Sequence, residues 1–322
     1  MYKIVTMVGR LCLLVIIGLQ SGCITVNLIE PSGPVREVQL SGTGDGKVLV
    51  LDLSGVISAQ DKDGLMPHPN MVALFKEELT RASKDDQIKA LVLRINSPGG
   101  TVTASDILYH ELREFKLKKK VPVIASMMDV AASGGYYLAM AADSIWVHPS
   151  TVTGSIGVIM LTVNARGLLE KVGLEANAIT SGPRKDMGSP FRVMTVEERA
   201  IFQSVIDSFY HRFLSVVEEG RPQLSSAQIR KLADGRIYSG DQAKAAGLID
   251  EIGYLDDAIE MAKKKAGLTE ARVVTYGHRG EYQNNIYSRL FGTSAGMAGF
   301  ANLDLLSMVR GGTPQFMYLW MP

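Results

Sequence analysis

The feature that most constrains the fold is an alternation of short apolar runs with longer helical segments. Runs rich in valine, leucine and isoleucine cover 47–57, 88–95 and 121–127, and amphipathic segments at 71–83 and 102–118 separate them. Short β-branched runs of this kind are typical of strands buried inside a parallel sheet. The alternation therefore predicts an α/β fold with a parallel β-sheet core, right-handed crossovers and helices on both faces.

The remaining chain extends this pattern with shorter elements. Strands are expected at 144–148, 157–162 and 272–276, with a strand-like stretch at 175–180. Helices are expected at 195–220, 225–232, 239–248 and 255–266. The first of these helices begins with a capping box and carries an apolar stripe, which predicts a core or subunit contact. A last apolar run, 316–321, is interpreted as a cover for a neighbouring subunit.

The N-terminal segment has the pattern of a targeting signal. Basic residues precede a short apolar run at 11–19, and small residues precede Cys23. This predicts a signal segment over 1–22 with Cys23 as the lipid-attachment site, although Gln20 stands where such signals usually carry leucine. The alternative is an uncleaved spanning anchor, for which the run falls short of about 20 residues. Either form anchors the domain to a bacterial membrane, on the periplasmic or cell-surface side.

Composition and boundaries set further limits. The chain is divided into a polar tether at 23–46, a main domain at 47–276 and a tail at 277–322 of unassigned structure. Of the 322 residues 46% are hydrophobic, which is ample for a large core, and the net charge of +1 gives no reason to expect nucleic acid. Acylation of Cys23 and loss of the preceding segment leave no thiol in the mature domain. No His/Glu/Cys cluster has metal-ligand spacing, so neither a metal nor a cofactor is expected.

A serine lies at the junction between the third apolar run and a helical segment. Ser133 is followed by two glycines, and a tight turn there would raise its Oγ, exposed, beside the free N–H groups of a helix N-terminus. An acyl-transfer nucleophile needs this arrangement, although most Ser-Gly-Gly segments are simple turns. The glycine-rich turn at 96–100 follows the second strand. Because parallel strands end at one edge of the sheet, the turn and the serine are expected to meet there.

A serine nucleophile also needs a base, and two residues are candidates. His148, 15 residues after Ser133, ends a predicted strand and is the only plausible histidine. Lys185 lies in a Gly- and Pro-punctuated loop, where a lysine is usually a solvated charge. A lysine base must be neutral, which requires a pKa lowered from about 10.4 towards about 7. Burial or the adjacent Arg184 can lower it, so the residues permit Lys185 without selecting it.

Five separated motifs resemble the signal peptide peptidase A family of membrane-bound bacterial serine peptidases. They are Asn-Ser-Pro-Gly-Gly at 96–100, Ala-Ala-Ser-Gly-Gly-Tyr-Tyr at 131–137, Thr-Gly-Ser-Ile-Gly-Val at 153–158, the loop 181–189, and Gly-Arg-Ile-Tyr-Ser-Gly at 235–240 with its continuation to 250. Their order and spacing match the family from about 47 to 268. The resemblance implies a Clp protease/crotonase-like fold and makes 47–276 a peptidase domain.

The resemblance also implies a role for each site residue. Ser133 is the expected nucleophile, Lys185 the general base and Ser155 the residue that orients the lysine amine. The N–H groups of Gly99 and Gly134 are expected to form the oxyanion hole. The expected substrates are apolar peptides, such as signal peptides left after secretion.

Short members of this family assemble into rings or domes in which the serine and the lysine come from adjacent subunits. This chain has one copy of each motif, so a homo-oligomer with shared sites is expected. In a lone subunit Ser133 and Lys185 are then expected to lie too far apart to hydrogen-bond.

Three alternatives remain at this stage. A Clp-type Ser-His-Asp protease would need a histidine where Val158 stands. A crotonase-type enzyme would bind acyl-CoA and would not be expected to carry a lipoprotein signal. A silent scaffold would keep the oligomeric fold without a reactive Ser133.

Overall fold

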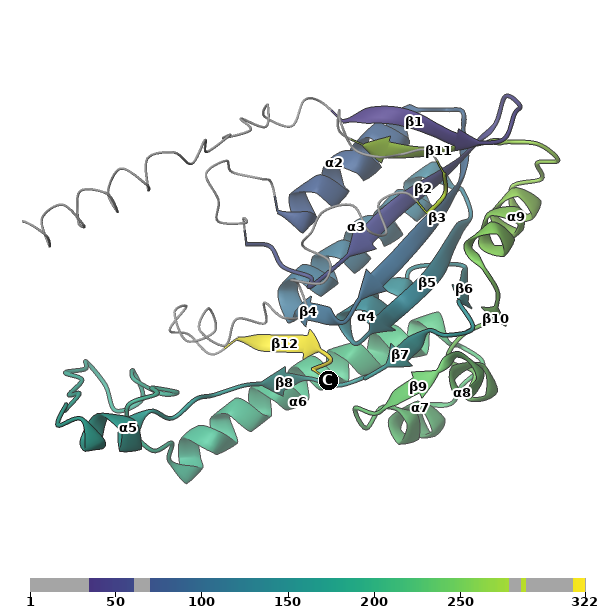
Figure 1. Ribbon diagram of the computed structural model, residues 1–322. Helices are drawn as coiled ribbons and strands as arrows, with labels where there is room; N and C mark the ends of the chain where they lie inside the picture. Colours follow the sequence, from purple (N-terminus) through teal and green to yellow (C-terminus); the bar gives the residue numbers. More distant parts are fainter. Residues whose placement is uncertain (1–34, 61–69, 278–284, 288–314, 322) are drawn as a thin grey trace, which may run out of the picture. The chain divides into compact units, whose positions relative to one another are not determined.

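The apolar runs form neighbouring parallel strands at the centre of one sheet. The computed structural model describes residues 35–60, 70–277, 285–287 and 315–321. Strands β2 (Lys47–Ser54), β3 (Ile88–Ser97) and β5 (Val123–Ala132) pair in parallel, with Leu51 opposite Leu93 and Leu93 opposite Ala125 (Figure 1). The predicted α/β class and parallel core are confirmed.

The sheet continues on both sides of these strands. Its order is β1-β11-β2-β3-β5-β6-β10, and β7 extends the sheet beside the end of β5 and pairs with β9. The outer pairs β1–β11 and β7–β9 are antiparallel. The bounds of these further strands are β1 Arg36–Ser41, β6 Ser144–Val147, β7 Val152–Gly154, β9 Ile237–Ser239, β10 Glu251–Ile252 and β11 Arg272–Gly277. A separate small sheet has the order β4-β12-β8, with β4 Gly99–Thr101, β8 Ile159–Met160 and β12 Phe316–Leu319.

Helices cover both faces of the main sheet, because side chains alternate along each central strand. In β2, Leu49, Leu51 and Leu53 enter the larger core cluster, whereas Val48 and Val50 enter a second cluster on the opposite face. The larger cluster packs under α2 (Met71–Lys84), α3 (Val102–Lys119) and α4 (Gly134–Ala139), and the second packs under α9 (Leu255–Lys265).

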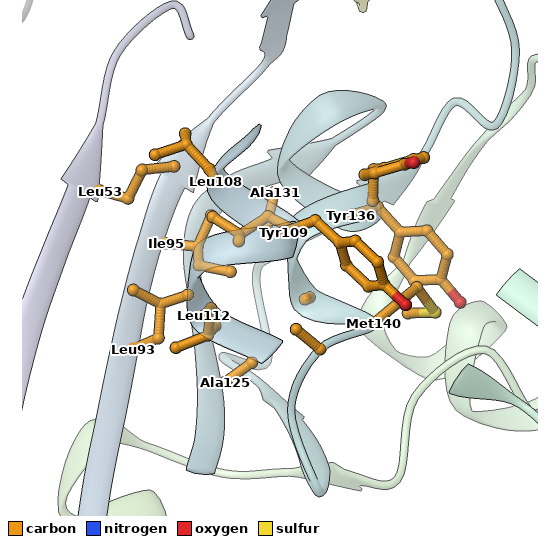
Figure 2. Close-up of a cluster of buried hydrophobic side chains, with 14 of the residues drawn as sticks. Leu53, Leu93, Ile95, Leu108, Tyr109, Leu112, Ala125, Ala131, Tyr136 and Met140 are labelled. Atoms are coloured by element: carbon orange, nitrogen blue, oxygen red, sulfur yellow. The ribbon is translucent and has the colours of Figure 1, made fainter. Parts of the chain in front are cut away.

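The larger cluster also anchors the region around the predicted nucleophile. Figure 2 shows Ile95 of β3, Leu108 and Tyr109 of α3, and Tyr136 and Met140 at α4 side by side in this cluster. All five side chains are at most 5% exposed. The short helix α4 is therefore fixed by packing on strands and helices together, which holds the residue that precedes it.

The long helix α6 (Val196–Gly220) links this core to a distant loop. Its C-terminal half contributes Phe213, Val216 and Val217 to the larger cluster, which confirms part of the predicted stripe. At about 1.5 Å per residue, 25 residues extend for about 37 Å. Its N-terminus has the predicted capping box of Thr195 and Glu198. The remaining helices are α5 Arg166–Lys171, α7 Ser226–Leu232 and α8 Gly240–Ala245.

Several expected boundaries were wrong. The tether at 23–46 and the domain start at 47 miss β1, which pairs along β11 and belongs to the domain. Strand β5 runs on to Ala132, beyond the expected end at 127. The stretch 175–180 is exposed and forms no strand, and only Ile159–Met160 of the strand expected at 157–162 is extended, outside the parallel sheet. Short apolar stretches carry too little pattern to separate strands from exposed loops.

The partner expected for the last apolar run, 316–321, was also wrong. Residues 316–319 pair with β4 and β8 of the same chain instead of covering a neighbouring subunit. The domain therefore includes a segment beyond the expected limit at 276. No local pattern could reveal this, because the pairing joins residues more than 150 positions apart.

Some expectations lie outside the described residues. These are the signal segment at 1–22, Cys23, the first part of the tether, most of the loop at 60–70 and most of the tail at 277–322. Among the helices in the ranges that the structure describes, none combines the length and the hydropathy that crossing a membrane requires.

Candidate active site

Ser133 occupies a strained junction between β5 and α4. Its backbone has φ 51° and ψ −113°, a conformation that costs a non-glycine residue about 1–3 kcal/mol. The Ser133 N–H donates to the Gly154 carbonyl at 2.8 Å, and its own carbonyl accepts from Tyr137 N–H at 2.8 Å. Two hydrogen bonds and the packed helix α4 therefore hold the residue in this conformation.

The hydroxyl of Ser133 is buried and lacks a partner. The residue is 1% exposed, and its Oγ accepts and donates no hydrogen bond in the described structure. The expectation of an exposed hydroxyl was therefore wrong for this conformation. A buried hydroxyl without a partner costs about 1–3 kcal/mol, and a catalytic role is one of the reasons for which native proteins keep such a group.

Ser155 lies beside Ser133 through strand register. Ala132 of β5 pairs with Gly154 of β7, so the next residue along each strand is one of the two serines. Ser155 also has positive φ, 49°, is 8% exposed and donates its N–H to the Arg236 carbonyl at 2.8 Å. The structure thus brings the predicted nucleophile and the predicted lysine-orienting residue to the same edge of the sheet.

Gly99 and Gly134 come into contact beside the serine. A Cβ on Gly99, whose φ is +98°, would lie 2.7 Å from the Gly134 nitrogen and 2.0 Å from the Tyr318 carbonyl oxygen. A Cβ on Gly134 would lie 2.4 Å from Ser105 Oγ. Only glycine fits either position, so the predicted oxyanion pair is assembled here by close backbone approach.

Two side chains that the sequence analysis missed support this edge. Ser97 Oγ accepts the Gly99 N–H at 3.1 Å and donates to the Gly55 carbonyl at 2.7 Å. Asn96 joins the ends of β3 and β5 by accepting from Val130 N–H at 3.1 Å and donating to Asp129 at 3.0 Å. Both residues lie in the Asn-Ser-Pro-Gly-Gly motif, which was the available signal.

Lys185 is not brought to Ser133 within one chain. It is exposed, and its side chain forms no hydrogen bond or ion pair with any residue that the structure describes. Its loop joins the N-terminal end of α6, whereas the other end of that helix packs near α4; Figure 1 shows the two regions well separated. The separation agrees with the expectation for a lone subunit.

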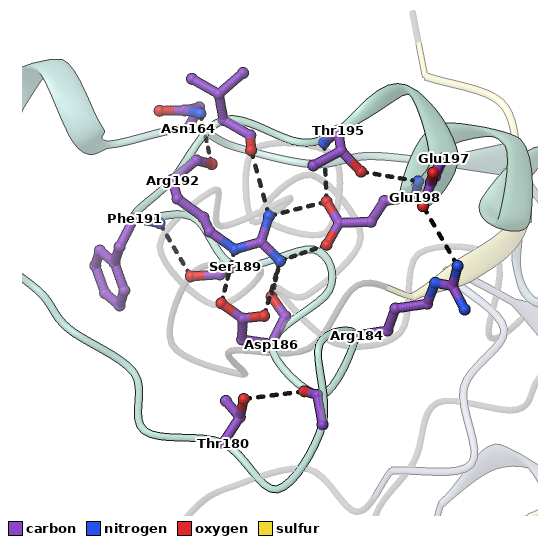
Figure 3. Close-up of polar contacts among 12 residues, drawn as sticks. Asn164, Thr180, Arg184, Asp186, Ser189, Phe191, Arg192, Thr195, Glu197 and Glu198 are labelled. Atoms are coloured by element: carbon purple, nitrogen blue, oxygen red, sulfur yellow. Dashed lines mark hydrogen bonds and ion pairs between the residues drawn. The ribbon is translucent and has the colours of Figure 1, made fainter.

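A charged network fixes the loop that carries Lys185. Arg192 Nε and Nη2 donate to the Asp186 carboxylate at 2.7 and 2.8 Å, and Nη1 donates to Glu198 Oε2 at 2.9 Å (Figure 3). Glu198 in turn accepts from the Thr195 N–H at 2.9 Å. The residue after Lys185 is thereby tied to the first turn of α6.

The network shifts the titration of its carboxylates. Hydrogen bonds from Arg192, and then from the Thr195 backbone, lower the pKa of Glu198 to about 2. The hydrogen bond from Arg192 also lowers the pKa of Asp186, and the two carboxylates raise the pKa of Arg192. All three groups therefore stay charged through the neutral range, and the network persists there.

The histidine candidate is engaged elsewhere. His148 Nδ1 lies 2.9 Å from Ser150 Oγ, and its ring packs edge-on against Tyr254 with centroids 4.7 Å apart. It does not hydrogen-bond to Ser133, whose Oγ has no partner. In the part of the chain that the structure describes, no three His, Cys, Asp or Glu side chains are grouped to hold a metal.

The fold and the site together define a class of protein. A buried serine hydroxyl without a partner among the described residues, beside two closely approaching glycines at the edge of a parallel sheet, fits a serine hydrolase. A Clp protease family model matches residues 68–150, in agreement with the Clp-like architecture, and a model of peptidase family S49 matches residues 115–269.

Curated relatives narrow this class. The chain is 38% identical over 246 residues to a putative signal peptide peptidase SppA of Enterococcus faecium, covering 75% of this chain and 70% of that one. It is 39% identical over 216 residues to the putative protease MJ0651 of Methanocaldococcus jannaschii, covering 67% and 68%. It is 35% identical to protease 4 of Haemophilus influenzae, covering 68% of this chain and 34% of that one. The chain belongs to peptidase family S49, among the SppA-type serine peptidases.

Proposed function

We propose that the protein is a membrane-attached endopeptidase that cleaves apolar peptides, including signal peptides left after secretion, with a Ser133–Lys185 dyad. The observation that carries the proposal is the Ser133 hydroxyl, buried and without a partner, next to Gly99 and Gly134. The name of the Enterococcus relative, a putative signal peptide peptidase, supports the substrate class.

The dyad is assembled between copies of the chain in this proposal. Ser133 Oγ has no hydrogen-bonded base among the described residues of its own subunit, and the Lys185 amine is exposed on a loop that Arg192 holds in place. Insertion of that loop against a neighbouring copy would remove the amine from water, which favours its neutral form. Ser155, beside Ser133, would accept a hydrogen bond from the amine and aim it.

The reaction then follows from these positions. The neutral Lys185 amine takes the proton of Ser133 Oγ, which attacks the peptide carbonyl. The N–H groups of Gly99 and Gly134 stabilise the oxyanion. To do so, the Gly99 N–H exchanges its hydrogen bond to Ser97 Oγ for one to the oxyanion. The Lys185 ammonium protonates the leaving amine, and water attacks the acyl-serine to release the second product.

Co-expression of two inactive variants tests the shared site. We expect Ser133→Ala and Lys185→Ala each to lower peptide hydrolysis by at least about 10³-fold, while Ser126→Ala, a buried serine elsewhere in β5, leaves it near normal. Particles containing both variants should recover about a quarter of the normal activity, since each shared site has one chance in two for each intact residue. Full activity in either single variant contradicts the dyad. Inactive singles without recovery contradict sharing between copies.

Membrane attachment is proposed through a lipid on Cys23. Mass spectrometry of the mature N-terminus should find an acylated cysteine, and Cys23→Ala should move the protein from the membrane to the soluble fraction. An unmodified Cys23 in a membrane-bound chain contradicts the lipid anchor and favours a spanning segment.

A further inference from the structure

The helix that begins after Ser133 is too short to hold itself in place. Helix α4 has six residues, which is less than two turns, and the Ser133 side chain does not cap its N-terminus. A helix this short gains too few hydrogen bonds to offset the cost of forming its first turn. Ser133 nevertheless keeps a positive φ of 51° and accepts the Tyr137 N–H at 2.8 Å. Contacts outside α4 must therefore hold the helix and the strained turn before it.

Two adjacent tyrosines of α4 supply such contacts. Tyr136 and Tyr137 are both fully buried. The Tyr136 hydroxyl donates to the Leu248 carbonyl at 2.7 Å, and the Tyr137 hydroxyl donates to Oδ1 of Asp106 on α3. Burial, and then the hydrogen bond to Asp106, raises the pKa of Tyr137, so this hydroxyl keeps its proton and remains a donor at neutral pH. The short helix is thus fastened by its phenols to two other parts of the domain.

The acceptor of the Tyr137 hydroxyl is itself held by an arginine from a third helix. Arg212 of α6 donates to the same Oδ1 of Asp106, from Nη2 at 3.0 Å and from Nε at 3.2 Å. Hydrogen bonds to an ionised group are stronger than those between neutral groups. Asp106 therefore joins α3, α4 and α6 through one oxygen atom, and its carboxylate is fixed in the direction of Tyr137.

A second ion pair also joins α3 and α6, and its phenol comes from α3. Arg113 of α3 donates to Glu219 of α6 at 2.7 Å, and Glu219 accepts from the Tyr109 hydroxyl at 3.3 Å. The side chains of this ion pair are 47% and 49% exposed, and those of the Arg212–Asp106 pair are 47% and 41% exposed. The two ion pairs therefore match in helices and exposure, and they differ in the helix that supplies the phenol.

We propose that Asp106 is a positioning residue for the nucleophile. It accepts the Tyr137 hydroxyl and so fixes α4, which holds Ser133 in its strained conformation beside Gly99 and Gly134. The step from α4 to catalysis rests on the proposed function, because it takes Ser133 as the nucleophile. Loss of the acceptor would let the short helix shift, and misplacement of a reacting group by about 1 Å can cost about 10²-fold in rate.

The first experiment measures peptide hydrolysis by variants of the full chain. Asp106→Ala should lower kcat about 10- to 30-fold with KM within about twofold of normal, because the nucleophile is misplaced while the peptide-binding surface is retained. Asp106→Asn keeps an oxygen acceptor for the phenol and should restore kcat to within about threefold of normal. The matched control, Glu219→Ala, should leave kcat within about twofold of normal. Equal losses of kcat in Asp106→Ala and Glu219→Ala overturn the proposal.

The second experiment breaks the same hydrogen bond from its other side. Tyr137→Phe removes the hydroxyl without leaving a buried donor unpaired, so it carries the test if Asp106→Ala does not fold. It should lower kcat by a similar factor. The double variant should be no more than about twofold below the slower single variant, because both changes remove one interaction. Losses that multiply in the double variant show that the two residues act independently, which contradicts the proposal.

The third experiment does not depend on peptide cleavage. Hydrogen exchange of residues 133–140, followed by mass spectrometry, should be at least about tenfold faster in Asp106→Ala than in the unmodified protein, and it should be unchanged in Glu219→Ala. Equal exchange in the two variants overturns the inference. Faster exchange in Asp106→Ala alone, in a protein whose unmodified form cleaves no peptide, supports the hold of Asp106 on α4 and overturns the proposed function instead.

Discussion

The two halves of the proposed dyad lie in opposite kinds of surroundings. Ser133 is fixed by strand register, a helix and a packed core, and it is 1% exposed. Lys185 is exposed on a loop held by a charged network, at the other end of α6. In the proposed mechanism, one chain therefore supplies the nucleophile and both glycine N–H groups, whereas the base comes from a neighbouring copy.

This contrast predicts that substitution of Lys185 has the largest difference between its effect on activity and its effect on stability. Lys185→Ala should lower hydrolysis by at least about 10³-fold, within the usual contribution of a general base, with little change in thermal midpoint because the side chain is exposed and forms no hydrogen bond or ion pair with the described residues. Lys171→Ala, equally exposed at the end of α5, is the control and should leave both quantities unchanged. A large drop in the midpoint of Lys185→Ala would show that the lysine is structural.

On the nucleophile side, activity and stability should fall together. Gly99→Ala places a methyl group 2.0 Å from the Tyr318 carbonyl at φ +98°, so we expect about 3 kcal/mol or more of destabilisation and about 10²-fold less activity. Gly55→Ala has a similar φ, +89°, with nothing within 4 Å, and should cost about 1–2 kcal/mol with little loss of activity. Urea unfolding and peptide hydrolysis measure both. Equal effects of the two substitutions would contradict the close contact at Gly99.

The loop network should matter for rate more than for the fold. Arg192→Gln frees Asp186 and the loop around Lys185, and misplacement of a catalytic group by about 1 Å can cost about 10²-fold, so we expect kcat to fall about 10- to 100-fold with little change in KM. Arg166→Gln, which breaks an exposed ion pair with Glu170, serves as the control. A kcat unchanged by Arg192→Gln would show that the network does not position the lysine.

The smallest effect is a pH dependence of the same loop. The folded-state pKa of Glu198, about 2, lies below the ordinary value of 4.5. The stabilisation that the ionised Glu198 carboxylate gives the loop is therefore complete above about pH 4.5, and it is lost as the pH falls towards 2. Hydrogen exchange of residues 182–195, corrected for intrinsic rates, should therefore speed up over that range. In Glu198→Gln this step should disappear. If hydrogen exchange in the loop of the unmodified protein does not change with pH, the assignment of this step to the Glu198 carboxylate is contradicted.

Much of the site was predictable because its residues lie in short motifs at strand ends. Ser133, Gly99 and Gly134 follow apolar runs, and parallel strands bring their carboxyl ends to one edge. Ser155 and Lys185 came from resemblance, since neither position has a local pattern of its own. The partners of Arg192 and the support from Ser97 could not be predicted, because side-chain pairing depends on loop conformations that apolar periodicity does not encode.

By itself the sequence determined the α/β class, the central parallel strands and the serine junction, since these follow from the period and β-branching of local segments. Only the tertiary structure decided that 36–41 and 316–319 belong to the domain, that the Ser133 hydroxyl is buried without a partner among the described residues, and that the Tyr318 carbonyl lies against Gly99 and Gly134. The physical reason is that local periodicity fixes which face of a segment is apolar. The partner of an edge strand is instead fixed by unpaired main-chain groups, which are alike in every sequence.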